Sequence, residues 1–259
     1  MKYVVLSFDD GRKDFYTNAF KILKKHHLPA VLNIISDYTK TNETEYVSWD
    51  EVKECSDCGI EIANHSAEHN NELESIVRGA KDIQKNLSTS EKIGFASPNS
   101  GVCRKNFDIY KNLLTSEHTA YVRSGNQLKR DGYFYAFLYL VYKYTASSKI
   151  FFWYNRRNII NLHKKSDDIF PSITCNYDNT VRQIIYFIEK MPDNSAGIIM
   201  LHRILEKGED DYKKDKWSNT AEDFDLLCNY LAKNENVSVI THKELCELIN
   251  VSQDEPRKK

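Results

Sequence analysis

Short apolar runs alternate with amphipathic stretches along most of this 259-residue chain. The runs that are too short for helices and therefore predict buried strands are residues 3–8, 30–35, 60–64, 93–96 and 119–123. The stretches between them that carry apolar side chains at helical spacing are residues 15–26, 49–58, 71–87 and 107–114. Alternation of strand and helix is typical of parallel strands wrapped by helices, in an open sheet or a barrel.

The second half of the chain follows the same pattern less regularly. The segments that predict strands there are residues 150–154, 197–201 and 237–241, and those that predict helices are 181–190, 221–232 and a last helix up to 249. Residues 133–144 are dense in aromatic side chains and too short to span a bilayer. They predict either a buried or partly amphipathic helix, or an exposed patch for a lipid-linked substrate or an interface.

Composition narrows the class of protein. The 36 basic and 37 acidic residues give a net charge of -1, which argues against nucleic acid as the partner. The amino terminus has no signal-peptide pattern, so we expect a cytoplasmic protein or a processed form whose leader is missing, with association to a membrane surface left open. One catalytic domain over residues 1–251 and a disordered tail over 252–259 are expected.

The six cysteines are scattered along the chain, a pattern typical of reduced thiols. Cys55 and Cys58 form a C-x-x-C motif without a second pair. Packing in the core is therefore favoured over a redox or zinc site.

Polar residues follow directly after three of the predicted strands. They are Asp9 and Asp10, then His65 and His69, and finally His202. Taken alone, each group has a simpler interpretation. The aspartate pair could belong to a turn, the histidine spacing could occur by chance, and His202 could be a hydrogen-bonding histidine. The carboxyl ends of parallel strands meet at one edge, however, so their order and placement together favour a shared site.

Two histidines four residues apart share one face if their segment forms a helical turn. Two imidazoles and one carboxylate are a typical ligand set for catalytic zinc, which keeps one coordination position open. The second aspartate is then free to act on a water molecule.

No transmembrane segment is predicted.

Three motifs resemble the polysaccharide deacetylase family, which is carbohydrate esterase family 4 with the NodB-homology domain. They are SFDDG at Ser7–Gly11, HSAEH at His65–His69, and Leu201-His202 at the end of a late strand. The resemblance runs from Tyr3 to about Leu248 and is weakest between residues 129 and 178. It implies an α/β fold, a distorted (β/α)7-type barrel with parallel strands and outer helices.

The same resemblance implies roles for these residues. Asp10, His65 and His69 would bind one divalent metal ion, zinc in the first place, with cobalt, nickel or manganese as alternatives. Asp9 would be the general base, metal-bound water the nucleophile and His202 the general acid. Leu201 would line the pocket for the acetyl methyl group, and Ser66 would help to hold the second motif.

The third motif of that family, R-x-P-x-G, is altered in this chain. Ala96 stands where the arginine is expected, and an extra residue precedes Gly101. Backbone N–H groups near Asn99 and Ser100 could assist at a developing oxyanion. The D-x-x-D-W motif that would supply a partner for His202 is missing, which leaves Asp178 as a weak candidate.

Trp217 could stack on a sugar ring or anchor the core, and both interpretations stay open. We expect a metal-dependent hydrolase that removes an N-acetyl group from an amino sugar or glycan, which could be lipid-linked. The alternatives are a hydrolase of a non-sugar amide or formamide, and a non-catalytic metal-containing glycan-binding protein. The sequence leaves the sugar, the physiological metal and the oligomeric state open.

Overall fold

Strand β1 (Lys2–Phe8) lies at the centre of a ten-stranded, mostly parallel sheet. It pairs in parallel with β2 (Val31–Ile34), β9 (Ser195–Leu201) and β12 (Val237–Val239). Beyond β2 the parallel strands are, in order, β3 (Glu61–Asn64), β4 (Ile93–Ala96), β5 (Thr119–Ser124) and β7 (Ile169–Pro171). The computed structural model describes residues 1–42, 44–102, 106–125, 133–164, 169–176, 179–208 and 215–254.

One segment of the chain brings the two edges of this sheet together. Strand β7 pairs with β5, and after the single residue Ser172 the chain continues as β8 (Ile173–Thr174), which pairs with β9. The sheet is therefore nearly closed into a barrel, and the predicted (β/α)7-type architecture is confirmed. Strand β6 (Ile160–Asn161) is antiparallel to β9, and β10 (Arg203–Leu205) pairs with β11 (Ser218–Thr220) in a separate small sheet.

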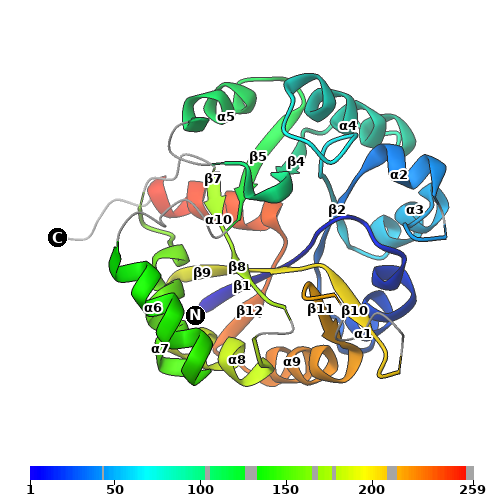
Figure 1. Ribbon diagram of the computed structural model, residues 1–259. Coiled ribbons are helices and arrows are strands. Elements are labelled where there is room, and N and C mark those ends of the chain that lie inside the picture. The colour runs from blue at the N-terminus through cyan, green and yellow to red at the C-terminus, as the bar shows by residue number, and fades with distance from the viewer. Residues whose placement is uncertain are drawn as a thin grey trace.

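Helices surround the sheet, as Figure 1 shows. In chain order they are a π-helix at Phe15–Ala19, α1 (Phe20–His26), α2 (Ser36–Thr41), α3 (Trp49–Asp57), α4 (Leu73–Asn86), α5 (Phe107–Leu114), α6 (Tyr133–Thr145), α7 (Ser148–Asn155), α8 (Val181–Lys190), α9 (Ala221–Lys233) and α10 (His242–Asp254). Local sequence sets their ends. At the start of α3, Ser48 Oγ accepts a hydrogen bond from Glu51 N while Glu51 Oε2 accepts one from Ser48 N, which forms a capping box.

Two predictions need correction. Residues 150–154 form part of α7 and not a strand, because this uninterrupted apolar run has no period that separates helix from strand. Phe151 packs there against Tyr142 of α6, with ring centroids 5.5 Å apart. Helix α10 extends to Asp254, into the tail that was predicted to be disordered, and residues 255–259 lie outside the described residues.

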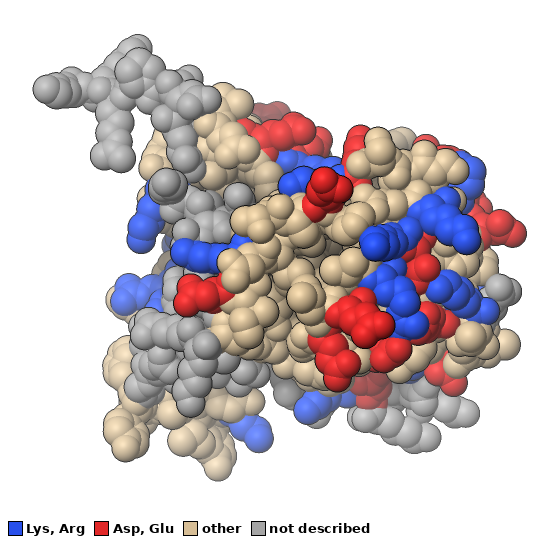
Figure 2. Space-filling model, turned by 90° about the horizontal axis from the view of Figure 1, so that it is seen from above, with Lys and Arg blue, Asp and Glu red and all other residues tan. Residues whose placement is uncertain are grey.

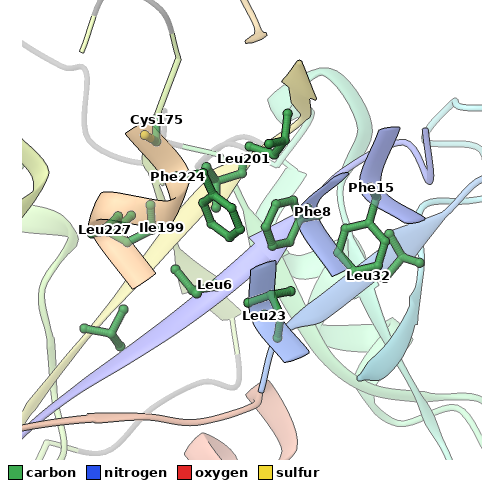
Figure 3. Packing of buried hydrophobic residues seen from close by; sticks show 14 of the residues in the cluster. Leu6, Phe8, Phe15, Leu23, Leu32, Cys175, Ile199, Leu201, Phe224 and Leu227 are labelled. Atoms are coloured by element: carbon green, nitrogen blue, oxygen red, sulfur yellow. The ribbon is translucent and has the colours of Figure 1, made fainter. Parts of the chain in front are cut away.

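The side chains of β1 alternate between two apolar layers. Leu6 and Phe8 face the helices and pack with Leu23 of α1 and Phe224 of α9 (Figure 3). Val5 belongs instead to a cluster inside the barrel. Because side chains alternate along a strand, Ser7 and Asp9 continue the interior row toward the carboxyl end.

Five of the six cysteines lie within the described ranges, and Cys55, Cys58, Cys175 and Cys228 are free thiols. Cys55 is buried in the layer between sheet and helices, as the packing interpretation predicts, whereas Cys58 is exposed and does not fit that interpretation. Cys103 lies outside the described residues.

Candidate metal and acid–base site

The predicted ligands Asp10, His65 and His69 lie together at the carboxyl ends of β1 and β3. Their nearest ligand atoms all lie within 4.8 Å of one another, and each histidine Nε2 is 3.3 Å from Asp10 Oδ1. Four ligands arranged tetrahedrally at about 2.1 Å from a zinc ion would lie about 3.4 Å from one another. The spacing of these three atoms therefore fits one small divalent cation.

The two histidines converge through a bend, not through the helical turn that their spacing suggested. Ser66 and His69 have left-handed backbone conformations, with φ of 65° and 57°. Ser66 Oγ accepts a hydrogen bond of 2.9 Å from Asn70 N, which holds the loop. The imidazole centroids are 5.1 Å apart. Asp10 also has a left-handed φ of 71°, which turns its carboxylate toward this loop.

The surroundings of these residues also suit a cation. His65 Nδ1 lies 2.8 Å from the backbone oxygen of Ala96, so Nδ1 donates to it and Nε2 is left as the ligand atom. Asp10 Oδ1 is buried and has no hydrogen-bond partner within the described part of the chain. A buried carboxylate oxygen without a donor is costly unless a cation binds it. Burial raises the pKa of Asp10, but the imidazoles of His65 and His69 outweigh burial and hold the pKa far below its usual range.

Asp9 points to the other side of the backbone and is fixed by three groups inside the barrel. Arg123 Nη2 lies 2.5 Å from Asp9 Oδ1 and 2.6 Å from Oδ2. Asn33 Nδ2 donates to Asp9 Oδ1 over 2.9 Å, and the backbone N–H of Asp9 donates to the Leu201 carbonyl over 2.8 Å. Arg123 is fully buried and Asp9 is 3% exposed, so this is a buried, charge-assisted pair.

Arg123 lies beside the position at which the altered third motif lacks its arginine. Ala96 of β4, at the position of the expected arginine, is the register partner of Arg123 on β5. A guanidinium is thus present on the neighbouring strand at the same level of the barrel. Arg123 Nη1 also donates to Ser172 Oγ over 3.2 Å, and Ser172 Oγ donates to the Ser124 carbonyl over 2.8 Å.

Sequence reasoning missed Arg123, Asn33 and Ser172. The first two carried a usable signal, because each interrupts an apolar strand at the position that faces the barrel interior. Arg123 follows the interior residue Tyr121 by two positions, and Asn33 follows Val31 in the same way. Ser172 had no such signal, since the break between β7 and β8 could not be predicted.

His202 lies directly after β9, with Nε2 3.9 Å from Asp9 Oδ2. Burial lowers the pKa of His202, although the carboxylates of Asp9 and Asp10 oppose this shift. His202 Nδ1 has no hydrogen-bond partner within the described residues. Asp178, the partner considered from the sequence, lies outside them.

Trp217 lies against His202, with ring centroids 4.8 Å apart, and is 37% exposed. The indole therefore covers the imidazole while part of it stays accessible. Arg203 points away from this pair, because its Nε donates to Asp14 Oδ2 over 2.9 Å.

Asn99, Ser100 and Leu201 are the remaining residues that were predicted to bind substrate. Asn99 and Ser100 lie in a short 3-10 turn after β4, both with a φ of 52°. Leu201 is 1% exposed and belongs to the layer between sheet and helices (Figure 3). Their roles in substrate binding stay predictions.

Comparison with protein families gives one match: residues 1–105 match the polysaccharide deacetylase family. This range includes the Asp9-Asp10 and His65–His69 motifs, whereas His202 lies beyond it. A comparison with curated proteins gives no match.

Solved structures resemble the chain over nearly its whole length. The Xyl-CE4 domain of a multidomain xylanase from the hindgut metagenome of Trinervitermes trinervoides is 16% identical, with a TM-score of 0.55 and coverage of 99% of this chain and 95% of that domain. A family 4 acetyl xylan esterase from Clostridium thermocellum, in complex with a cobalt ion, is 17% identical, with a TM-score of 0.53 and coverage of 96% of each chain. At this identity the likeness shows the fold, a (β/α)7 barrel.

A Streptococcus pyogenes deacetylase in complex with acetate matches over a smaller part. It is 20% identical with a TM-score of 0.41, and the match covers 46% of this chain and 54% of the deacetylase.

Proposed function

We propose that the chain, whose residues 1–105 match the polysaccharide deacetylase family, is a hydrolase that removes an N-acetyl group from an amino sugar or glycan and releases acetate. One observation carries this proposal. The Asp10, His65 and His69 cluster lies beside a second, separately held carboxylate, Asp9, which is 3.9 Å from His202. A site that only bound a cation would need neither the extra carboxylate nor the extra imidazole.

Asp10, His65 and His69 would hold the cation, and zinc is our first choice among divalent metals because two imidazoles and a carboxylate suit it. When bound, such an ion would polarise the acetyl carbonyl and lower the pKa of a water molecule. His65 is oriented for this by its Nδ1 contact to Ala96 O, as ligating histidines usually are.

Asp9 is proposed as the general base. It would take a proton from the water whose oxygen attacks the acetyl carbon. Arg123 and Asn33 fix the position of its carboxylate, so that little reorganisation is needed when the proton arrives. This support also weakens one of the two grounds for a non-catalytic glycan-binding protein, which were the missing arginine at position 96 and the missing D-x-x-D-W motif.

His202 is proposed as the general acid. When the C–N bond breaks, its electron pair goes to the nitrogen, which would accept a proton from the imidazolium of His202. Burial opposes this charged form, while the Asp9 carboxylate at 3.9 Å favours it. Trp217, in contact with His202 and partly exposed, is placed where a sugar ring could stack.

The test is acetate release from a panel of N-acetylated sugars and short glycans. The protein is first treated with a chelator, then assayed before and after addition of zinc or cobalt. Metal-dependent release supports the proposal and identifies the substrate, and the Asp9→Asn variant serves as the matched inactive control. Release from formamides or non-sugar amides alone would favour the alternative hydrolase. If no substrate of the panel releases acetate although metal is bound to the protein, the proposal is contradicted.

A further inference from the structure

Helix α6 carries two apolar stripes, of which only one is buried. Leu138 and Tyr142, four residues apart, are 8% and 7% exposed. Tyr142 packs on Phe151 of α7, and its hydroxyl donates to Gln183 Oε1 of α8 over 3.3 Å. These contacts fix which face of α6 points toward the rest of the molecule.

The second stripe of α6 faces solvent. Its members recur at intervals of four, three and four residues and are Tyr133, Phe137, Leu140 and Tyr144, with exposures of 97%, 60%, 52% and 85%. Residues at this spacing share one side of a helix. Among the described residues, six of the seven exposed large aromatic side chains lie on α6 and α7. Such a concentration exceeds the isolated apolar residues of an ordinary surface.

The charged side chains of the α6–α7 segment have one sign. Residues 133–164 contain five basic residues, Lys143, Lys149, Arg156, Arg157 and Lys164, and no acidic residue. The remainder of the chain therefore has 31 basic and 37 acidic residues. In Figure 2, red and blue side chains mix over the right-hand part of the molecule, whereas the surface at the lower left that is not grey is tan and blue.

Trp153 of α7 extends the pattern. It is 47% exposed, and the Arg156 guanidinium lies 3.8 Å from the centroid of its ring. An amphipathic aromatic ring beside a basic group is the arrangement that side chains adopt at the level of lipid headgroups.

We infer that the outward face of the α6–α7 hairpin docks on an anionic lipid bilayer. Exposed Tyr, Phe and Leu would enter the headgroup region, and Lys143, Lys149 and Arg156 would face lipid phosphates. At about 1.5 Å per residue, the thirteen residues of α6 are far shorter than a bilayer core. No helix among the described residues is long and apolar enough to cross a membrane. The hairpin would therefore lie in the surface of the bilayer.

The test is co-sedimentation of the full chain with vesicles of phosphatidylcholine alone and with vesicles that also contain phosphatidylglycerol. We expect binding to the anionic vesicles that weakens as salt is raised. Leu140→Glu should reduce that binding by about tenfold or more, because it places a carboxylate in the apolar stripe. Leu226→Glu on α9 is the matched control, since Leu226 is 54% exposed, and it should bind as the wild type does.

Three outcomes would overturn the inference. They are no binding to anionic vesicles, an equal effect of the two variants, and self-association of the chain that Leu140→Glu abolishes without changing vesicle binding. The last would make a second copy of the chain the occupant of this face. Both variants keep the site residues, so acetate release from a small water-soluble substrate tests the proposed function separately.

Discussion

Removal of the Arg123 guanidinium is the most direct test of how Asp9 is held. Arg123→Met keeps most of the side-chain volume but leaves the Asp9 carboxylate buried with Asn33 as its remaining side-chain donor. Breaking a buried ion pair on one side costs about 3–5 kcal/mol of folding free energy. Against a typical net stability of about 5–15 kcal/mol, the variant should fold but be clearly less stable.

The activity of Arg123→Met should fall as well. Without Arg123, one of the two side chains that orient the Asp9 carboxylate is lost, so turnover per folded molecule should drop by about tenfold or more. A purely structural loss would lower the amount of folded protein without changing turnover per folded molecule.

The pairing register of β4 and β5 suggests a double variant that should restore the guanidinium contact to Asp9. Ala96 and Arg123 are paired and point to the same side of the sheet on strands about 4.8 Å apart. The double variant Ala96→Arg/Arg123→Ala moves the guanidinium one strand across at nearly constant interior volume. It should recover part of both stability and activity.

Urea unfolding and metal-supplemented acetate release measure the two effects. Stability of Arg123→Met within about 1 kcal/mol of wild type, together with unchanged turnover per folded molecule, would refute the reasoning. If the single variant loses stability and activity and the double variant does not recover them, the contact of Arg123 with Ser172 at its native position matters as well.

Three further predictions follow from the site and the core. His69→Ala should weaken metal binding by at least about tenfold, measured as metal content after dialysis, and normal content would remove His69 from the ligand set. Asp9→Asn should retain metal yet lose about a hundredfold or more in turnover, and full activity would show that another group is the base. Burial, and then the charge of Arg123, hold the pKa of His242 well below 6.5, so the folded chain leaves His242 neutral where the unfolded chain binds a proton. This difference lowers stability as pH falls below about 6.5, by up to about 1.4 kcal/mol per pH unit, and His242→Gln should remove it in urea unfolding; an unchanged pH dependence would contradict the assignment.

Much of the fold could be predicted because its elements are short and strongly patterned. Strand β4 at Ile93–Ala96 and helix α5 at Phe107–Leu114 have the predicted ends. The segment at residues 150–154 failed because an unbroken apolar run has no period that separates strand from helix. The broken strand β7–β8 was also missed, since two- and three-residue strands exist only through their pairing partners.

The candidate site, like the fold, was predicted only in part. Asp9, Asp10, His65, His69 and His202 were identified from the sequence, because polar residues directly after apolar strands are unusual and parallel strands end at one edge. The helical turn suggested for the second motif was wrong, since two left-handed residues form a bend that spacing alone does not reveal.

What the sequence by itself determined is the set of residue types at the strand ends, and with it the chemistry they can perform. Only the tertiary structure decided which groups support them. Arg123 is distant from Asp9 in sequence, and nothing local links the two. Closing the sheet places β5 across the barrel from β1 with Ala96 beside Arg123, so the long guanidinium reaches the carboxylate through the interior. The same closure leaves α6 at the surface, where packing of Leu138 and Tyr142 decides which of its two apolar stripes meets solvent.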